Sequence, residues 1–239
     1  MEEEMKKRIA EFRDHIAGLR DDWGFPEREA CIDRFLETGE PGEIQAVRYT
    51  DCFEKMLAEI STPVGEQELL LGNVIQGNIE FPMEIVPGDG YSHVHNPFTV
   101  YDRCAGHCCP DYALLLQGGL KQIAEEIREA AGDLNAAHKS RNGEGRAGLS
   151  GRDACRRLWA ACAGRSITSI HAFAQRYSAY AQEKAATQAD EKRKVELCRA
   201  AQSLKRVPFY PAESFQDALQ SVWFVHMILS CLAGGRDFA

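Results

Sequence analysis

The spacing of apolar residues along most of the chain is that of amphipathic helices. Ile167, Ile170, Phe173, Tyr177 and Tyr180 recur at steps of three and four, which places them on one face of a helix. The same spacing, interrupted at Gly and Pro, predicts a series of helices. They cover residues 2–20, 27–38, 44–60, 111–131, 151–187, 189–205 and 215–232.

Two segments depart from this pattern. Residues 68–109 combine short apolar runs and β-branched residues with many glycines and prolines, which predicts a few short strands or extended loops. Pro110 and Asp111 then open the next helix, because Pro suits a first turn and an acidic residue there complements the helix dipole. Residues 132–151 are polar and rich in glycine, and we expect them to form a mobile surface loop within one domain.

The last expected helix, residues 215–232, is apolar on nearly every side. Ser214 and Asp217, three residues apart, form a capping signal at its start. A helix of this kind is buried in a large protein. Because the chain then ends in GGRDFA, we expect further polypeptide to complete the fold.

Composition excludes several classes of protein. The 239 residues are 44% hydrophobic and 27% charged, as in soluble globular proteins. The net charge of −8 argues against nucleic acid as a partner. The longest apolar run, Val222–Leu229, is too short to span a membrane, and the charged N-terminus lacks the core of a signal peptide. We therefore predict a cytoplasmic protein with no membrane partner, whose nine cysteines are mostly reduced.

Cysteine and histidine cluster before the helix at 111. Cys104, His107, Cys108 and Cys109 lack the second ligand pair of a structural zinc site. His93 and His95, two apart on a strand, would share a face. With His107 they could form a three-histidine metal site, although polar loop histidines are the more frequent explanation of such a pattern. Motifs for nucleotide binding or for a serine nucleophile are absent from the sequence.

Four stretches together resemble the N-terminal half of glycyl radical enzymes, the pyruvate formate-lyase-like superfamily. Their order and spacing agree with that family over residues 44–239. GHCCPDYALLLQGGL is similar to the family's G-H-x-x-P-D-Y-x-x-[VL]-L-x-x-G-L. VPFYPAESFQDALQSVWF is similar to V-P-x-x-P-A-x-[ST]-F-x-E-A-L-Q-x-x-W-F. The stretches are ELLLGN (68–73), GHCCPDYALLLQGGL (106–120), AQRYSAYAQEKA (174–185) and VPFYPAESFQDALQSVWFVHMIL (207–229).

The resemblance implies a fold and an incomplete domain. We expect a predominantly α structure with a few short strands, the N-terminal portion of the ten-stranded α/β barrel of glycyl radical enzymes. Residues 1–239 would form one incomplete domain of the pyruvate formate-lyase type. Gly119 would permit close approach to a neighbouring element, and Cys108 and Cys109 fill variable positions without a chemical role.

The resemblance also implies a chemistry whose main parts lie elsewhere. In this family a separate radical S-adenosylmethionine activase oxidises a glycine to a radical, which passes to a cysteine that abstracts hydrogen from a small substrate. The products arise from cleavage of a C–C, C–N, C–O or C–S bond in anaerobic metabolism. Neither the R-V-[SA]-G-[YF] glycine loop nor the cysteine loop occurs in this sequence. We therefore expect this chain alone to be inactive and to bind no cofactor.

His107 and Asp111 lie in a matched motif and are the candidates for lining a substrate pocket. The structural alternative is that His107 bonds a loop carbonyl and Asp111 caps a helix. The expected partners are a small-molecule substrate, an activating enzyme, and a missing C-terminal half or related subunit. Two other functions remain open: a non-catalytic interaction or subunit protein on the same scaffold, and a small metal-binding protein using His93, His95 and His107.

Overall fold

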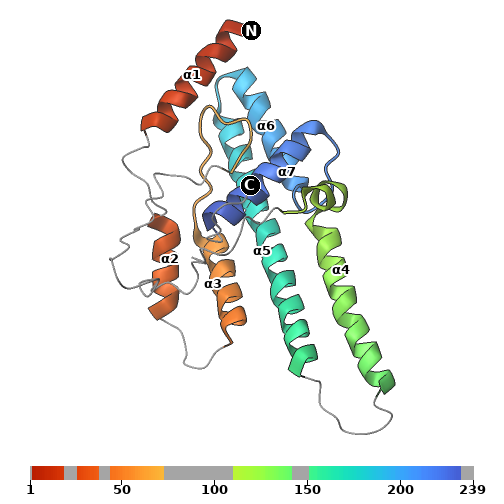
Figure 1. Ribbon diagram of the computed structural model, residues 1–239. Coiled ribbons are helices and arrows are strands. Elements are labelled where there is room, and N and C mark those ends of the chain that lie inside the picture. The colour runs from red at the N-terminus through yellow and green to blue at the C-terminus, as the bar shows by residue number, and fades with distance from the viewer. Residues whose placement is uncertain (1, 19–25, 38–43, 73–109, 142–150, 233–239) are drawn as a thin grey trace, which may run out of the picture.

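The computed structural model describes residues 2–18, 26–37, 44–72, 110–141 and 151–232, and every element in these ranges is helical (Figure 1). The prediction of a predominantly α structure is confirmed. The described residues contain no strand, so the expected strands and the barrel stay predictions, and most of residues 68–109 lies outside these ranges. The helices are α1 (Glu2–Gly18), α2 (Pro26–Glu37), α3 (Gln45–Glu59), α4 (Tyr112–Arg141), α5 (Gly151–Thr187), α6 (Glu191–Arg206) and α7 (Phe215–Met227), which continues as the π-helix η2 (Ile228–Leu232).

Six of these helices begin and end close to the predicted positions, and α4 does not. The sequence predicts a helix that ends at residue 131, whereas α4 continues to Arg141. Residues 132–141 are therefore helical and not part of a loop. The alanine-containing run after Gly132 has enough helix propensity to carry the helix past one glycine. Residues 142–150 lie outside the described residues, and a mobile loop there stays a prediction.

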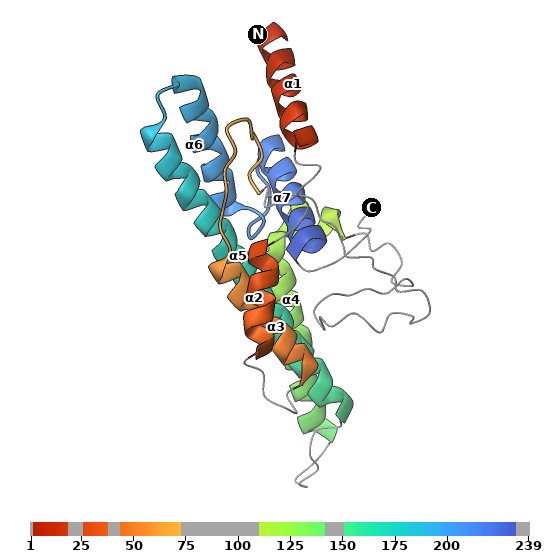
Figure 2. The same ribbon diagram turned by 90° about the vertical axis from the view of Figure 1, so that its left-hand side faces the viewer.

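Helix α5 is the central element of the bundle. It packs against α3, α4 and α6, and α4 lies beside it along much of its length (Figures 1 and 2). At its middle Phe173 and Tyr177 are fully buried and meet Phe224 of α7, with ring centroids 5.2–5.6 Å apart. These three rings form the centre of the largest hydrophobic cluster.

The predicted apolar stripe on α5 is wrong at its last position. Tyr180 is 38% exposed and lies beneath the ammonium group of Lys184. The buried face instead continues through small residues, Ala174, Ala181 and Ala185. Because alanine side chains are short, they allow α6 to approach α5 closely, and α6 contributes alanines of its own to the same contact.

An irregular segment runs from the end of α3 to the surface of α7, and we call residues 61–72 the strap. A segment without regular structure must find other partners for its backbone groups when it is buried. Here side chains of α5, α6 and α7 supply those partners. Just before the strap begins, Arg176 donates to the carbonyls of Leu57 and Ile60 at the end of α3, both at 2.7 Å. Within the strap, Lys184 donates to Val64 O at 2.9 Å.

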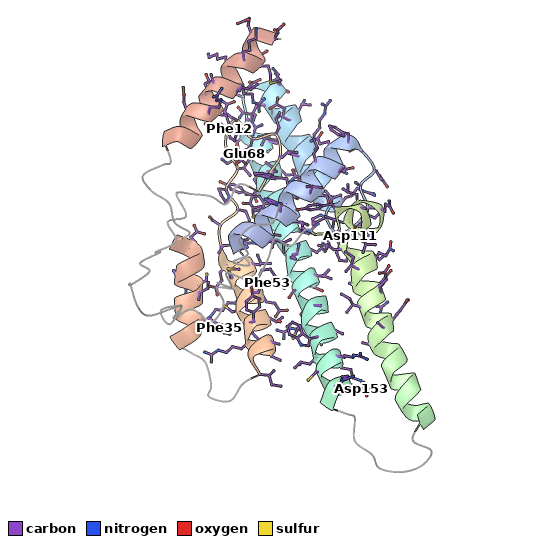
Figure 3. All side chains as sticks on the ribbon, in the orientation of Figure 1. Phe12, Phe35, Phe53, Glu68, Asp111 and Asp153 are labelled. Atoms are coloured by element: carbon purple, nitrogen blue, oxygen red, sulfur yellow. The ribbon has the colours of Figure 1, made fainter. Side chains whose placement is uncertain are left out.

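The second half of the strap is held by α6. Arg193, which is only 8% exposed, donates to Gly65 O at 2.9 Å and to Glu68 O at 2.6 Å. Glu68 in turn accepts from the backbone N–H of Gly65 at 3.1 Å. Figure 3 shows Glu68 between α1 and the upper part of the bundle. The strap is therefore a fixed element whose path is determined by side chains far away in sequence.

Candidate functional site

Helix α7 begins at a cap that also fixes it to α6. The hydroxyl of Ser214 accepts from the backbone N–H of Asp217 at 3.1 Å, as the capping signal predicts. The Asp217 carboxylate is buried and accepts from Ser203 Oγ of α6 at 2.5 Å and from the Glu213 backbone N–H at 3.4 Å. A buried carboxylate with these donors sets the position and direction of α7.

The strap ends on the buried face of α7. Gln220 is fully buried, and its amide exchanges two hydrogen bonds with the backbone of Leu71, at 2.9 Å from Leu71 N–H and 2.7 Å to Leu71 O. Gly72 follows with φ +119°, and a Cβ there would lie 3.0 Å from the Phe224 ring and 3.3 Å from the Met227 methyl. Only glycine combines this backbone conformation with such a close approach.

The start of α4 meets the same helix. Asp111 is the N-cap, since its Oδ1 accepts from the backbone N–H of Leu114 at 2.9 Å (Figure 3). Tyr112 Oη lies 3.3 Å from Nδ1 of His226 in α7. Residues 72 and 110–112 flank the undescribed segment 73–109, and on both sides of it the chain is attached to the last turn of α7.

A second contact fixes α4 against the segment that precedes α7. Gly119 has φ +70° and breaks α4 into two helical parts. A Cβ at this position would lie 2.4 Å from the carbonyl oxygen of Phe209. The N–H groups of Leu120 and Lys121 donate to Pro208 O and Phe209 O, both at 2.9 Å. The prediction that Gly119 permits close approach to a neighbouring element is confirmed.

Two features distinguish the surroundings of this site. The imidazole of His171 stacks on Phe209 with ring centroids 4.1 Å apart, and burial lowers the pKa of His171, so that the neutral form is favoured. Helix α7 changes into the π-helix η2, with Ile228 and Leu232 buried. Short π-helical turns inside α-helices are frequent at functional sites.

The predicted site residues are only partly within the described chain. Asp111 caps α4, which is the structural alternative for this residue, and its place beside a substrate pocket stays a prediction. His107 lies outside the described residues, together with His93 and His95 of the proposed metal site. Among the residues that the structure does describe, no three His, Cys, Asp or Glu side chains are grouped to hold a metal ion.

Sequence reasoning missed the residues that hold this region together. Gln220, Arg193 and the Tyr112–His226 pair received no role, although Gln220 and Tyr112 lie in matched motifs. The signal that could have identified Gln220 is its polarity on a largely apolar helix that is expected to be buried, because a buried polar residue needs a partner. Chemically, the arrangement offers hydrogen-bond donors and acceptors that fix the backbone, and one Tyr–His pair within hydrogen-bonding distance.

Comparison with known proteins supports the resemblance. The family model described as pyruvate formate lyase-like matches residues 91–237. The isethionate sulfite-lyase of Desulfovibrio desulfuricans is 32% identical over 117 residues, which cover 49% of this chain and 13% of that protein.

Solved structures share the fold of this chain. The B12-independent glycerol dehydratase from Clostridium butyricum, in its glycerol-bound form, superposes with a TM-score of 0.71 and 18% identity, covering 94% of this chain and 34% of that one. A structure described as concerning 1,2-propanediol dehydration in Roseburia inulinivorans superposes with a TM-score of 0.62 and 19% identity. The match covers 85% of this chain and 29% of that one. A glycyl radical enzyme from Archaeoglobus fulgidus superposes with a TM-score of 0.64 and 20% identity. The match covers 85% of this chain and 31% of that one. The chain thus spans about a third of the length of these structures.

No helix in the described ranges is both long and apolar enough to cross a membrane.

Proposed function

Because the chain belongs to the pyruvate formate lyase-like family, we propose that it is the N-terminal part of a glycyl radical enzyme. The whole enzyme would be a radical lyase or transferase that cleaves a C–C, C–N, C–O or C–S bond of a small substrate. The cysteine that becomes a thiyl radical and the glycine that stores the radical would lie outside these 239 residues. An activating enzyme of the radical S-adenosylmethionine type would install the radical.

A bare apolar stripe on α7 is the observation that carries this proposal. Phe215, Leu219 and Trp223, at steps of four, share one face of the helix and are 80%, 42% and 38% exposed. The opposite face, with Gln220 and Phe224, is fully buried. A helix that has one buried face and an apolar stripe on the exposed face is suited to an interior position, so the stripe fits a contact with further polypeptide.

The role proposed for this chain is to build part of the wall around the reacting centre. A radical survives only where water and oxidants are excluded, which requires closely packed elements on every side. The strap and α4 are both fixed to α7, the strap through Gln220 and Gly72 and α4 through Tyr112. These contacts hold both flanks of segment 73–109, which contains the pocket candidate His107, in fixed positions for such a wall.

The relatives narrow the proposed chemistry. By their names, one acts on isethionate by releasing sulfite, and two are concerned with glycerol and 1,2-propanediol dehydration. Loss of sulfite breaks a C–S bond, and loss of water breaks a C–O bond. We therefore propose a small hydroxylated substrate and one of these two eliminations.

Two experiments test this proposal: sequencing of the DNA that follows the codon for Ala239, and then spectroscopy of the encoded protein. We expect a reading frame with a cysteine loop and an R-V-x-G-[YF] motif. The encoded protein, incubated without oxygen with an activase and S-adenosylmethionine, should give the electron paramagnetic resonance doublet of a glycyl radical. Replacement of the motif glycine by alanine should abolish the signal.

A non-catalytic subunit on the same scaffold is the second candidate, and the same bare stripe favours it. It predicts a reading frame that ends at Ala239 and a stable complex with a separately encoded relative. That outcome would contradict the first proposal, because the radical would then belong to another chain.

A further inference from the structure

Helix α1 is attached to the rest of the described chain through polar side chains. Arg8 forms a two-pronged contact with the Glu196 carboxylate, at 2.8 and 3.0 Å, and donates to Gln67 O at 3.0 Å. Lys192 contacts Glu4 at 2.6 Å, and Gln67 donates to Glu11 at 3.1 Å. In both views α1 stands at one end of the molecule, beside α6 and apart from the main bundle (Figures 1 and 2).

None of the apolar side chains that the structure describes in α1 is fully buried. Met5 and Ile9 are 45% and 52% exposed, and Phe12 is half-buried. None of the hydrophobic clusters formed by the described residues includes a residue of α1. A cavity of about 390 Å³ separates α1 from residues 66–67 and the start of α6, and its lining is rich in charged side chains. The contact is therefore made mainly by charged and polar side chains around this cavity.

The contact between Arg8 and Glu196 is linked to Arg193, the residue that holds the strap. Glu196 accepts from Arg8 and also from Arg193, at 3.0 Å. Arg193 holds the carbonyls of Gly65 and Glu68 on either side of Gln67, whose own carbonyl accepts from Arg8. One carboxylate thus orients both the arginine of α1 and the arginine that fixes the strap.

We propose that α1 is a detachable arm held by an ionic latch, and that its docking tightens the strap. The latch is Arg8, Glu196 and Arg193. The side chains of Arg8 and Glu196 are 17% and 18% exposed, and those of the neighbouring Lys192–Glu4 pair are 56% and 61% exposed. Salt screens the exposed pair most and the partly buried pair less, whereas hydrophobic contacts do not weaken in this way. The arm should therefore leave at an ionic strength at which the bundle stays folded, and the strap between residues 65 and 68 should loosen when it leaves.

Hydrogen exchange of the whole chain, read by mass spectrometry, tests the latch. Between about 20 mM and about 500 mM NaCl, we expect amides of α1 to exchange about five- to tenfold faster, as the loss of a few weak ion pairs implies. Amides at residues 65–68 should exchange faster as well. Amides in the middle of α5 should keep their protection, which shows that the bundle has not unfolded.

Two variants of α1 that remove the same charge test whether Arg8 in particular holds the helix. Arg8→Gln should exchange at low salt as the unchanged chain does at high salt, and it should respond little to added salt. Lys6→Gln removes the same charge from the same helix, but Lys6 pairs with Glu2 and Glu3 within α1, so this variant should keep the latch. Both variants are at exposed or partly exposed positions and leave the core intact.

Three results would overturn the proposal. They are exchange in α1 that does not change with salt, equal effects of Arg8→Gln and Lys6→Gln, and loss of protection in α1 only together with α5. Protection that falls in α1 but not at residues 65–68 would overturn the coupling to the strap. None of these outcomes bears on whether the chain is part of a radical enzyme.

Discussion

Single residues in this chain matter most where they satisfy backbone groups that no secondary structure satisfies. Gln220 is the clearest case, because its amide reproduces the hydrogen bonds that a neighbouring strand would give to Leu71. Arg176 and Arg193 act in the same way on carbonyls of Ile60 and Glu68. The four stretches that resemble glycyl radical enzymes meet at α7, where Gln220, His226 and Phe224 contact Leu71, Tyr112 and Tyr177 respectively.

Replacement of Gln220 by alanine tests this role. The variant leaves the N–H and C=O of Leu71 buried without partners, and we expect the free energy of unfolding to fall by about 2–4 kcal/mol. Urea denaturation followed by circular dichroism measures the change. Gln202→Ala on the exposed side of α6 is the control, and it should change stability by less than about 0.5 kcal/mol. Equal effects of the two substitutions would show that the Leu71 contact contributes nothing.

Glycine at 119 is a second residue whose replacement has a defined outcome. Gly119→Ala introduces a Cβ at φ +70° and 2.4 Å from Phe209 O, so we expect a loss of at least about 2 kcal/mol in unfolding free energy. Gly132→Ala, in the same helix and with no atom within 4 Å of the added Cβ, should instead raise stability by about 0.5–1 kcal/mol. Denaturation curves of the two variants should move in opposite directions, and movement in the same direction would contradict the contact between α4 and Phe209.

At the scale of elements, the helices differ in what holds them. Helix α5 is held by buried aromatic and aliphatic side chains. Helix α4 is held by a smaller hydrophobic cluster with α5 and α7 and by backbone hydrogen bonds with Pro208, Phe209 and Ala212. Helix α1 is held by charges. Helices attached in different ways should respond to different conditions. We expect the attachment of α1 to depend on pH, because charged side chains make it.

The pKa of Glu196 is lowered chiefly by its hydrogen bonds with Arg8, and then by Arg193. Since the folded pKa lies below the ordinary value of 4.5, this contact stabilises docking at pH values above 4.5 and is lost as pH falls through the folded pKa. The pKa of Glu4 is lowered by Lys192 in the same sense. We expect protection factors of α1 amides, corrected for intrinsic exchange, to fall as pH is lowered from about 6 to below about 4.

The Arg8→Gln variant is the control for this pH effect. Without Arg8 the α1 contact is weak at every pH, so its protection factors should start low and change little. A decrease of the same size in the variant and in the unchanged chain would assign the effect to another carboxylate.

At the scale of the whole molecule, the bare stripe on α7 is the main feature left without an internal partner in the described residues. The related structures contain about twice as much further chain as the part that this chain matches. The stripe gives a direct measurement of whether such chain covers α7.

Tryptophan fluorescence makes that measurement. In this chain alone, with the other tryptophans replaced by phenylalanine, Trp223 should be quenched by iodide to an extent that fits its 38% exposure. In the longer protein or in a complex, we expect quenching of Trp223 to fall at least about threefold, because burial excludes the ion. A second variant that keeps only Trp159, which is 65% exposed on α5, is the comparison, and its fluorescence should stay quenched. Unchanged quenching of Trp223 would contradict the proposed contact.

Local patterns in the sequence determined the helices of this protein. Apolar spacing, Gly and Pro breaks, and the Ser214–Asp217 cap depend on neighbours a few residues apart, so they can be recognised without a fold. Gly119 was recognised through resemblance. The sequence did not indicate that α4 continues to Arg141 or that Tyr180 is exposed, because small differences in propensity and the packing of alanines against α6 decide these points.

Tertiary structure alone decided which distant residues meet. The Gln220–Leu71 contact joins positions 149 residues apart, and the Arg8–Glu196 pair joins positions 188 apart. No periodicity within one segment records such pairs, since each depends on how several helices pack at once. The path of the strap, the ionic attachment of α1 and the bare face of α7 all follow from that packing.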